Sequence, residues 1–143
     1  MIAQTLTTSF KVQLLTATHD FTLTTGDIFK MALYLPTASL GADTTVYTAT
    51  GEITGTGYTA GGIVITSITP TSSGTTAYVS FNTATFTSLV DTSIAGALIY
   101  NSSKSNKSVA VLDFGSTKIS TVAAPLVITF PTASSTTAII RLP

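Results

Sequence analysis

The sequence contains no cysteine and no tryptophan, and ionisable side chains are scarce. Without cysteine the chain can form no disulfide, no thiolate metal site and no thiol nucleophile. Asp, Glu, Lys and Arg together supply 8% of the residues, against about a quarter in a typical soluble domain. The only histidine is His19, so any Ser-His-Asp triad would have to include it. These shortages predict a protein that is not an enzyme.

The few charges cancel one another and are dispersed along the chain. Six Lys and Arg side chains balance six Asp and Glu side chains, which gives a formal net charge of zero. Lys104 and Lys107 form the closest cationic pair. Nucleic-acid binding requires several clustered basic side chains that displace counterions, so the sequence argues against it. Zero net charge also provides little colloidal repulsion, which favours association, including formation of a homo-oligomer.

Long hydrophobic runs are also missing, although the mean hydropathy is +0.50. The most apolar runs, such as Ala95–Tyr100 and Val109–Leu112, have the length of strands, whereas a membrane-spanning helix needs about 20 apolar residues. Residues 1–15 have neither the apolar core nor the early positive cluster of a secretory signal peptide. We therefore expect a soluble protein without a membrane partner, made in a reducing cytoplasm.

Threonine is abundant, at about a fifth of the chain, and Val, Ile, Tyr and Phe accompany it in nearly every segment. These residue types suit a pleated, half-buried surface better than a helix. Short apolar runs alternate with Gly, Asn, Ser and Asp clusters, as in an antiparallel β-sandwich or barrel. The sequence predicts one all-β domain over residues 1–143, with strands at Ile28–Leu35, Ile63–Ile68, Ala77–Phe86, Gly96–Tyr100, Val109–Phe114, Leu126–Phe130 and Ala138–Leu142.

One short helix is expected near the start of the chain. Thr8 or Ser9 can cap it, and apolar side chains recur at helical spacing from Phe10 onwards. The helix would end around His19, whose ring could then satisfy the terminal carbonyl groups. This position explains the histidine better than catalysis does.

The segment before the helix, residues 1–8, is a possible N-terminal arm. Apolar and polar residues alternate in it, and it contains no turn residue. Such a segment could add as a strand to a neighbouring subunit, with Ile2 and Leu6 as contact residues.

The carboxylates show no pattern of a catalytic or metal site. Most of them fall in predicted loops, and no D-x-D-x-D-G calcium loop occurs. Asp113 differs, because it lies in the apolar run 109–115, where an ionised side chain facing the core would need a partner. We expect it at the end of a strand, accepting backbone N–H groups. The glycine-rich string 55–60 lacks the following helix that a dinucleotide site requires. We predict no catalytic residue, no metal and no cofactor.

Several segments, in the same order along the chain, resemble small virion proteins of tailed phages and prophages. The resemblance covers most of the chain. It implies a structural protein of the virion, assembled in the host cytoplasm. In particular, it implies a capsid decoration or cement protein that binds and stabilises the shell of the major capsid protein. The segments that carry it are Ser9–Lys11, His19–Phe21, Gly26–Asp27, Phe29–Tyr34, Gly55–Gly62, Gly96–Asn101 and Asn106–Gly115.

Two other functions stay open. One is a tail or baseplate component, including a receptor-binding module that recognises a glycan; the other is a small glycan-active hydrolase. A glycan site usually presents an aromatic platform, which in the absence of tryptophan would need tyrosines such as Tyr58 and Tyr100. Some of the tyrosines should belong to the core, which favours the capsid shell. The candidate interaction residues are Ile2, Leu6, Tyr58, Tyr100, Lys104 and Lys107.

Overall fold

The two longest strands, β7 (Asp91–Asn101) and β8 (Lys107–Ser120), form the hairpin at the centre of the computed structural model, which describes all 143 residues. They belong to a five-stranded antiparallel sheet with the strand order β1-β8-β7-β2-β3. The strands predicted over Gly96–Tyr100 and Val109–Phe114 are therefore confirmed, and both are longer than predicted. The other strands of this sheet are β1 (Thr5–Leu6), β2 (Phe29–Tyr34) and β3 (Ile63–Ile65).

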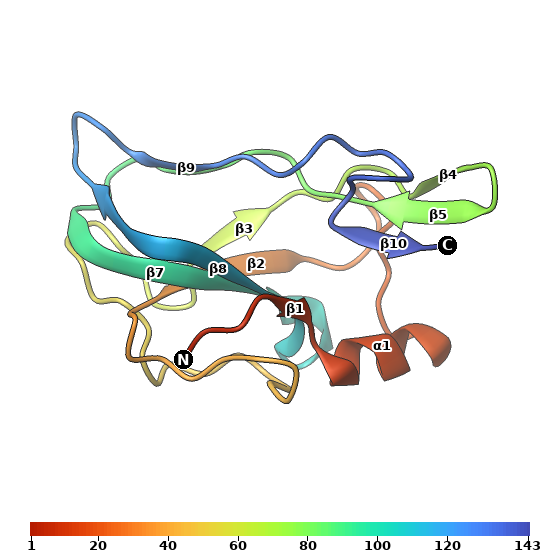
Figure 1. Cartoon of the computed structure of the whole chain (residues 1–143), viewed down its shortest axis with the longest axis horizontal. Helices are drawn as coiled ribbons and strands as arrows, with labels where there is room; N and C mark the ends of the chain where they lie inside the picture. Colours follow the sequence, from red (N-terminus) through yellow and green to blue (C-terminus); the bar gives the residue numbers. More distant parts are fainter.

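A second layer of short strands lies over one face of this sheet (Figure 1). It consists of a three-stranded sheet, β10-β5-β4, and a two-stranded pair, β6-β9. All strand pairs are antiparallel, so the prediction of an all-β, sandwich-like fold is confirmed. The strands are β4 (Thr71–Ser73), β5 (Thr76–Val79), β6 (Ala84–Phe86), β9 (Leu126–Ile128) and β10 (Ile140–Leu142).

The main core lies between the two layers and is rich in phenylalanine. Phe21 stacks on Phe29 at a ring-centroid distance of 4.5 Å, and Phe29 meets Phe81 edge to face at 5.7 Å. Phe81 in turn contacts Phe130, which follows β9. Such aromatic pairs contribute about 0.5–1.5 kcal/mol each beyond the burial of their area. The chain of rings joins the first layer to the second.

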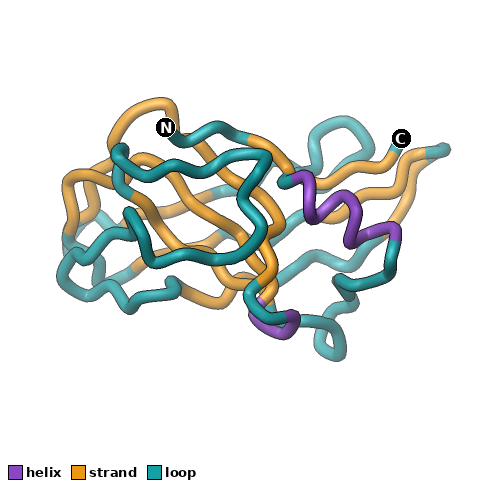
Figure 2. Tube along the Cα trace, turned by 90° about the horizontal axis from the view of Figure 1, so that it is seen from below, coloured by secondary structure: helices purple, strands orange, loops and turns teal.

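A smaller core lies on the opposite face of the five-stranded sheet. The chain after β2 crosses this face, as the loops in Figure 2 show, and buries Ala38 and Leu40 against it. β2, β7 and the first half of β8 are therefore covered on both faces, so Val109, Ala110 and Val111 are all buried. This explains why β8 reads as a continuous apolar run rather than as an alternating one.

The single α-helix, α1 (Thr8–Leu15), is close to its predicted position but has different ends. Thr7 caps it, because the Thr7 Oγ1 atom accepts a hydrogen bond from the Phe10 N–H at 3.4 Å. The prediction of Thr8 or Ser9 as the cap was therefore wrong by one or two residues. The helix also ends four residues before His19. The structure contains no helix with the length and apolar character needed to cross a bilayer.

The strand predicted over Ala77–Phe86 is two strands, β5 and β6, in different sheets. The chain leaves one sheet at Ser80, whose carbonyl accepts a hydrogen bond from Ile68 N–H, and enters the next after Asn82, which bonds Thr66. Two apolar runs in succession carry no local signal of such a change of sheet. β4 lies before this predicted strand, in a stretch where no strand was predicted.

Candidate functional site

Residues 1–8 do not extend as an arm in this structure, because Thr5 and Leu6 form β1 in the chain's own sheet and α1 begins at Thr8. β1 pairs with β8, with Thr5 opposite Val111 and Leu6 opposite Ala110. Ile2 is buried and forms a parallel bridge with Leu40. Of the two contact residues predicted here, Ile2 therefore belongs to the smaller core. Leu6 is half-buried at the edge of the sheet.

The two lysines of the predicted cationic pair do not form a patch. Lys104 lies in the short 3₁₀ turn η1 (Ser102–Lys104) that follows β7, and its Nζ atom is 3.5 Å from Asp27 Oδ1. Lys107 is half-buried at the start of β8, opposite Asn101. One charge is thus balanced inside the chain, and the other belongs to a strand in the sheet.

Tyr58 and Tyr100 belong to an internal cluster around Glu52, which is buried. The Tyr58 hydroxyl donates to Glu52 Oε1 and the Tyr47 hydroxyl donates to Glu52 Oε2, both at 2.6 Å. The Gly61 N–H donates to Glu52 Oε1 at 2.7 Å, and the Gly61 carbonyl accepts from the Tyr100 hydroxyl at 2.7 Å. We call these five residues the Glu52 cluster. The hydroxyl hydrogens of its three tyrosines are all donated to acceptors within the chain.

Burial, together with the Glu52 carboxylate, raises the pKa of the Tyr47 and Tyr58 hydroxyls well above the ordinary value of 10.0. Both phenols therefore stay protonated donors at all physiological pH values. The Tyr47 and Tyr100 rings also stack on each other at 4.9 Å. The tyrosine hydroxyls are hydrogen-bonded within the chain, and the Tyr47 and Tyr100 rings cover one face of each other. The cluster therefore stabilises the fold and does not form the open aromatic platform that a glycan requires. The sequence analysis missed it, and the one available signal was a lone glutamate close to two tyrosines.

His19 occupies a buried network and does not bind the helix carbonyls, contrary to the prediction. Its Nε2 atom lies 2.8 Å from Gln13 Oε1, and its Nδ1 atom lies 2.9 Å from Asn101 Nδ2. Asn101 Oδ1 accepts from the Ser103 N–H, so its Nδ2 is the donor, and it also donates to Asp27 Oδ2 at 2.7 Å. His19 Nδ1 is therefore an acceptor, and the proton is on Nε2. Both ring nitrogens are bonded to amides rather than to a serine hydroxyl.

This network predicts a loss of stability in mild acid. Burial, only partly opposed by Asp27, lowers the pKa of His19 below its ordinary value of 6.5, and Lys107 and Lys104 lower it further. Below pH 6.5 the unfolded chain thus binds more protons than the folded chain. The contribution of His19 is fully present above pH 6.5, declines as the pH falls, and levels off below the folded-state pKa.

Urea unfolding of the wild type and of His19→Gln between about pH 5 and 8 measures this effect, since that window lies above the carboxylate titrations. The stability difference between the two proteins should shrink as the pH falls. A difference that stays constant over the window would contradict the network.

Asp113 is exposed in the middle of β8, not at the end of a strand as predicted. Its Oδ1 atom accepts from the Gly115 N–H at 2.9 Å. The pairing of β8 with β7 is irregular here, because Gly96 pairs with Asp113 whereas Ile94 pairs with Lys118. The extra residues of β8 form a bulge, and Gly115 takes a φ of +71° within it. Because Asp113 is exposed, its carboxylate needs no buried partner.

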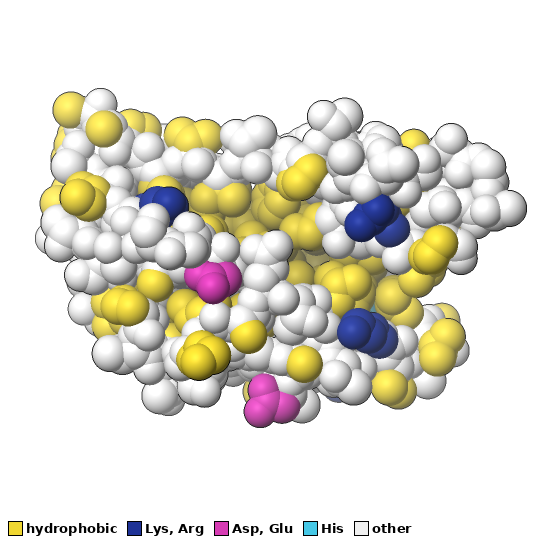
Figure 3. Space-filling model, viewed as in Figure 1, with side chains coloured by type: hydrophobic (Ala, Val, Ile, Leu, Met, Phe, Trp, Pro, Cys, Tyr) yellow, Lys and Arg dark blue, Asp and Glu magenta, His cyan; other side chains and the backbone are white.

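An open groove of about 480 Å³ runs along the side of the sandwich where the two layers do not join. β1 covers β8 only at Ala110 and Val111, so the apolar interior is accessible beside and beyond it. Figure 3 shows this hollow, with hydrophobic side chains on its floor. Nine of its 16 lining residues are hydrophobic. They include five half-buried side chains that pack on the main core, namely Leu6, Leu112, Phe114, Ile128 and Ile139.

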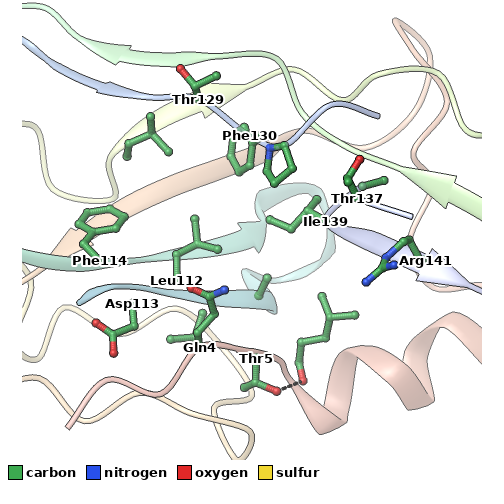
Figure 4. A pocket seen from close by; sticks show the side chains of 16 residues that line it. Gln4, Thr5, Leu112, Asp113, Phe114, Thr129, Phe130, Thr137, Ile139 and Arg141 are labelled. Atoms are coloured by element: carbon green, nitrogen blue, oxygen red, sulfur yellow. Dashed lines mark hydrogen bonds between the residues drawn. The ribbon is translucent and has the colours of Figure 1, made fainter. Parts of the chain in front are cut away.

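Two charged side chains mark opposite ends of the groove, Asp113 and Arg141 (Figure 4). Neither takes part in an ion pair, since the single ion pair of the chain joins Lys104 to Asp27. Arg141 donates one hydrogen bond, to the Thr136 carbonyl. An apolar floor, with charged side chains at the rim that form no ion pair, has the composition of an interaction surface. Of the predicted interaction residues, the groove includes only Leu6.

No three His, Asp or Glu side chains are grouped so that they could hold a metal ion. Comparison of the chain with protein-family models, with curated proteins and with solved structures gave no match. Function is therefore inferred from the side chains and surfaces of this chain.

Proposed function

We propose that this chain is a non-catalytic structural protein of a tailed-phage virion, and specifically a capsid decoration protein that binds and stabilises the major capsid shell. One contrast carries the proposal. The buried polar side chains are satisfied within the chain, whereas apolar surface is left open to solvent. The resemblance of the sequence to small phage virion proteins supplies the setting.

The buried polar side chains are hydrogen-bonded within the chain. Every buried side-chain nitrogen and oxygen has a hydrogen-bond partner. The buried carboxylate, Glu52, accepts three hydrogen bonds, and His19 is bonded at both ring nitrogens. A general base or nucleophile needs a free atom within hydrogen-bond reach of a substrate. These two groups have no such atom, which supports a function based on surface contact.

Apolar surface is available in several places, among them the groove and the outer face of α1. On the helix, Leu15 is 90% exposed and Val12 is 57% exposed. Weak apolar contacts of this kind become strong when many copies bind a repeating shell, because each bound site raises the effective concentration at the next. A sparsely charged surface also costs little to desolvate on such a shell.

Copy number in the virion tests the proposal. Quantitative mass spectrometry of purified virions should find the protein in numbers that scale with the major capsid protein. A number that fits one symmetric ring would instead favour a tail or baseplate component. Turnover of a glycan that disappears when one acidic residue is neutralised would overturn the non-catalytic assignment.

The helix face should contribute to shell binding. We expect Val12→Asp with Leu15→Asp to leave the melting temperature nearly unchanged, since both side chains are exposed, and to weaken binding to undecorated shells about tenfold or more. Co-sedimentation with shells measures this. Val64→Asp is the matched control, because Val64 is 60% exposed on β3. Equal binding by all three proteins would exclude α1 from the contact.

A further inference from the structure

We propose that the groove receives the β8–β9 turn (residues 121–125) of a second copy of this chain, so that copies associate head to tail. This inference goes beyond the proposed function and holds whichever structure the protein decorates. It rests on a concave apolar site with an acid, Asp113, at its rim and on a convex apolar segment with a lysine, Lys118, beside it, which cannot meet within one chain.

The β8–β9 turn projects from one end of the molecule (Figure 1), and its sequence, Thr-Val-Ala-Ala-Pro, is mostly apolar. All five of its residues are exposed, and Val122 is 75% exposed. Ile119, at the base of the turn, is 64% exposed. The turn contains no charged residue. Apolar side chains grouped on a projecting segment mark a contact surface rather than a free one.

The turn is ordered before it binds. The Thr121 N–H donates to the Ala124 carbonyl at 3.0 Å, and the Ala124 N–H donates back to the Thr121 carbonyl at 3.1 Å. At its base, Ser120 Oγ accepts from the Leu126 N–H and donates to the Leu89 carbonyl. A preordered segment loses little conformational entropy on binding. The same hydrogen bonds tie the turn to its own end of the sandwich, away from its own groove, so the occupant is another copy.

Charge complementarity favours this pairing. Lys118 is the basic side chain next to the turn, and its Nζ atom donates a hydrogen bond to Ser116 Oγ at 3.0 Å. The acid at the rim of the groove is Asp113, which has no ion-pair partner. Lys118 of one copy can therefore pair with Asp113 of the next. At the other end of the groove, the free donors of Arg141 suit the carbonyl groups of the inserted turn.

Size and net charge agree with this arrangement. Val122, Ala123 and Ala124 are small, and the groove of about 480 Å³ is in the range of sites that enclose a compact ligand. The chain has no net charge, so no long-range repulsion opposes the contact. A head-to-tail contact uses two different surfaces, and it generates a closed ring or an open filament.

A mixing experiment tests the proposal. Val122→Asp alters the turn, and Thr129→Arg blocks the exposed wall of the groove. In sedimentation velocity, the wild type should form oligomers as its concentration rises, and each variant should associate about tenfold or more weakly. An equimolar mixture should form a 1:1 heterodimer, because the intact turn of Thr129→Arg fits the intact groove of Val122→Asp.

The mixture separates a head-to-tail contact from a symmetric one. A symmetric contact of groove with groove or of turn with turn would pair one intact surface with one damaged surface, whereas the head-to-tail contact pairs two intact ones, so a mixture that stays monomeric overturns the proposal. A wild type that is monomeric at every concentration also overturns it. Val64→Asp is the matched control and should associate like the wild type.

Charge reversal tests the proposed ion pair. Asp113→Lys and Lys118→Asp should each weaken association, and the double variant should restore it, because the pair is then re-formed with opposite sign. Failure of the double variant to recover would overturn the pairing of these two residues. Circular dichroism checks that every variant keeps the β fold.

Discussion

Gly62→Ala is expected to remove a large part of the stability of the fold. Gly62 has a φ of +71°, and a Cβ atom added there would lie 1.7 Å from the Met31 carbonyl oxygen in β2. The backbone at this point cannot shift without breaking the β2–β3 pairing that starts one residue later. Left-handed strain and the clash together should cost about 4 kcal/mol or more, against about 5–15 kcal/mol for a typical domain. Urea unfolding measures the loss.

Gly74→Ala is the matched control for this prediction. Gly74 also has a positive φ, +59°, but a Cβ atom there would meet nothing within 4 Å. The control should therefore lose only the cost of the left-handed conformation, about 1–2 kcal/mol. If both variants lose the same free energy, close packing of the 55–62 loop on β2 is not what demands glycine at position 62.

Glu52→Ala should have the second-largest effect. It removes the acceptor of three hydrogen bonds and leaves the Tyr47 and Tyr58 hydroxyls and the Gly61 N–H without a partner. Tyr47 is only half-buried, so water can replace one of these bonds. We expect a loss of about 3 kcal/mol and a fall of about 10 °C in melting temperature. Differential scanning calorimetry measures both quantities.

Two further variants separate the contributions of the Glu52 side chain. Glu52→Gln keeps one accepting oxygen and the shape of the side chain, so it should lose less than Glu52→Ala. Asp43→Ala removes an exposed acid and should change the stability by no more than about 0.5 kcal/mol. A Glu52→Ala variant as stable as Asp43→Ala would show that the cluster contributes little.

Both predictions concern the chain between β2 and β3, which covers β2 and also bonds the Leu33 N–H through the Tyr58 hydroxyl at 2.9 Å. None of its residues lines the groove. The properties of the groove and those of the Glu52 cluster can therefore be measured independently. Glu52→Gln, which should still fold, is expected to keep the self-association of the wild type.

The fold class could be predicted because its signals are local. β-branched and aromatic residues favour strands wherever they stand, and the hairpin between 96 and 114 has a polar connection between two apolar runs. Helix α1 was found from its spacing, although its cap was misplaced. Thr7 serves as the cap partly because its hydroxyl also bonds Ser108 at 2.9 Å, a contact 101 residues away along the chain. No local pattern reports such a partner.

The candidate site was mostly beyond prediction for the same reason. Asp113 was singled out for its apolar neighbours, but its exposure depends on which part of β8 the other segments leave uncovered. Arg141 drew no attention, because its place opposite β8 depends on how β10 joins the second layer. His19 was placed by its sequence distance from the helix, whereas one of its two partners is Asn101, 82 residues further on.

The sequence by itself determined that this chain is built from strands, has one short helix near its start, and carries few ionisable groups. Those properties follow from residue type and from neighbours along the chain. Only the tertiary structure decided which polar groups satisfy one another, where the two layers fail to close, and which apolar side chains stay exposed. These outcomes depend on contacts between segments far apart in sequence, and backbone topology, not local preference, brings such segments together.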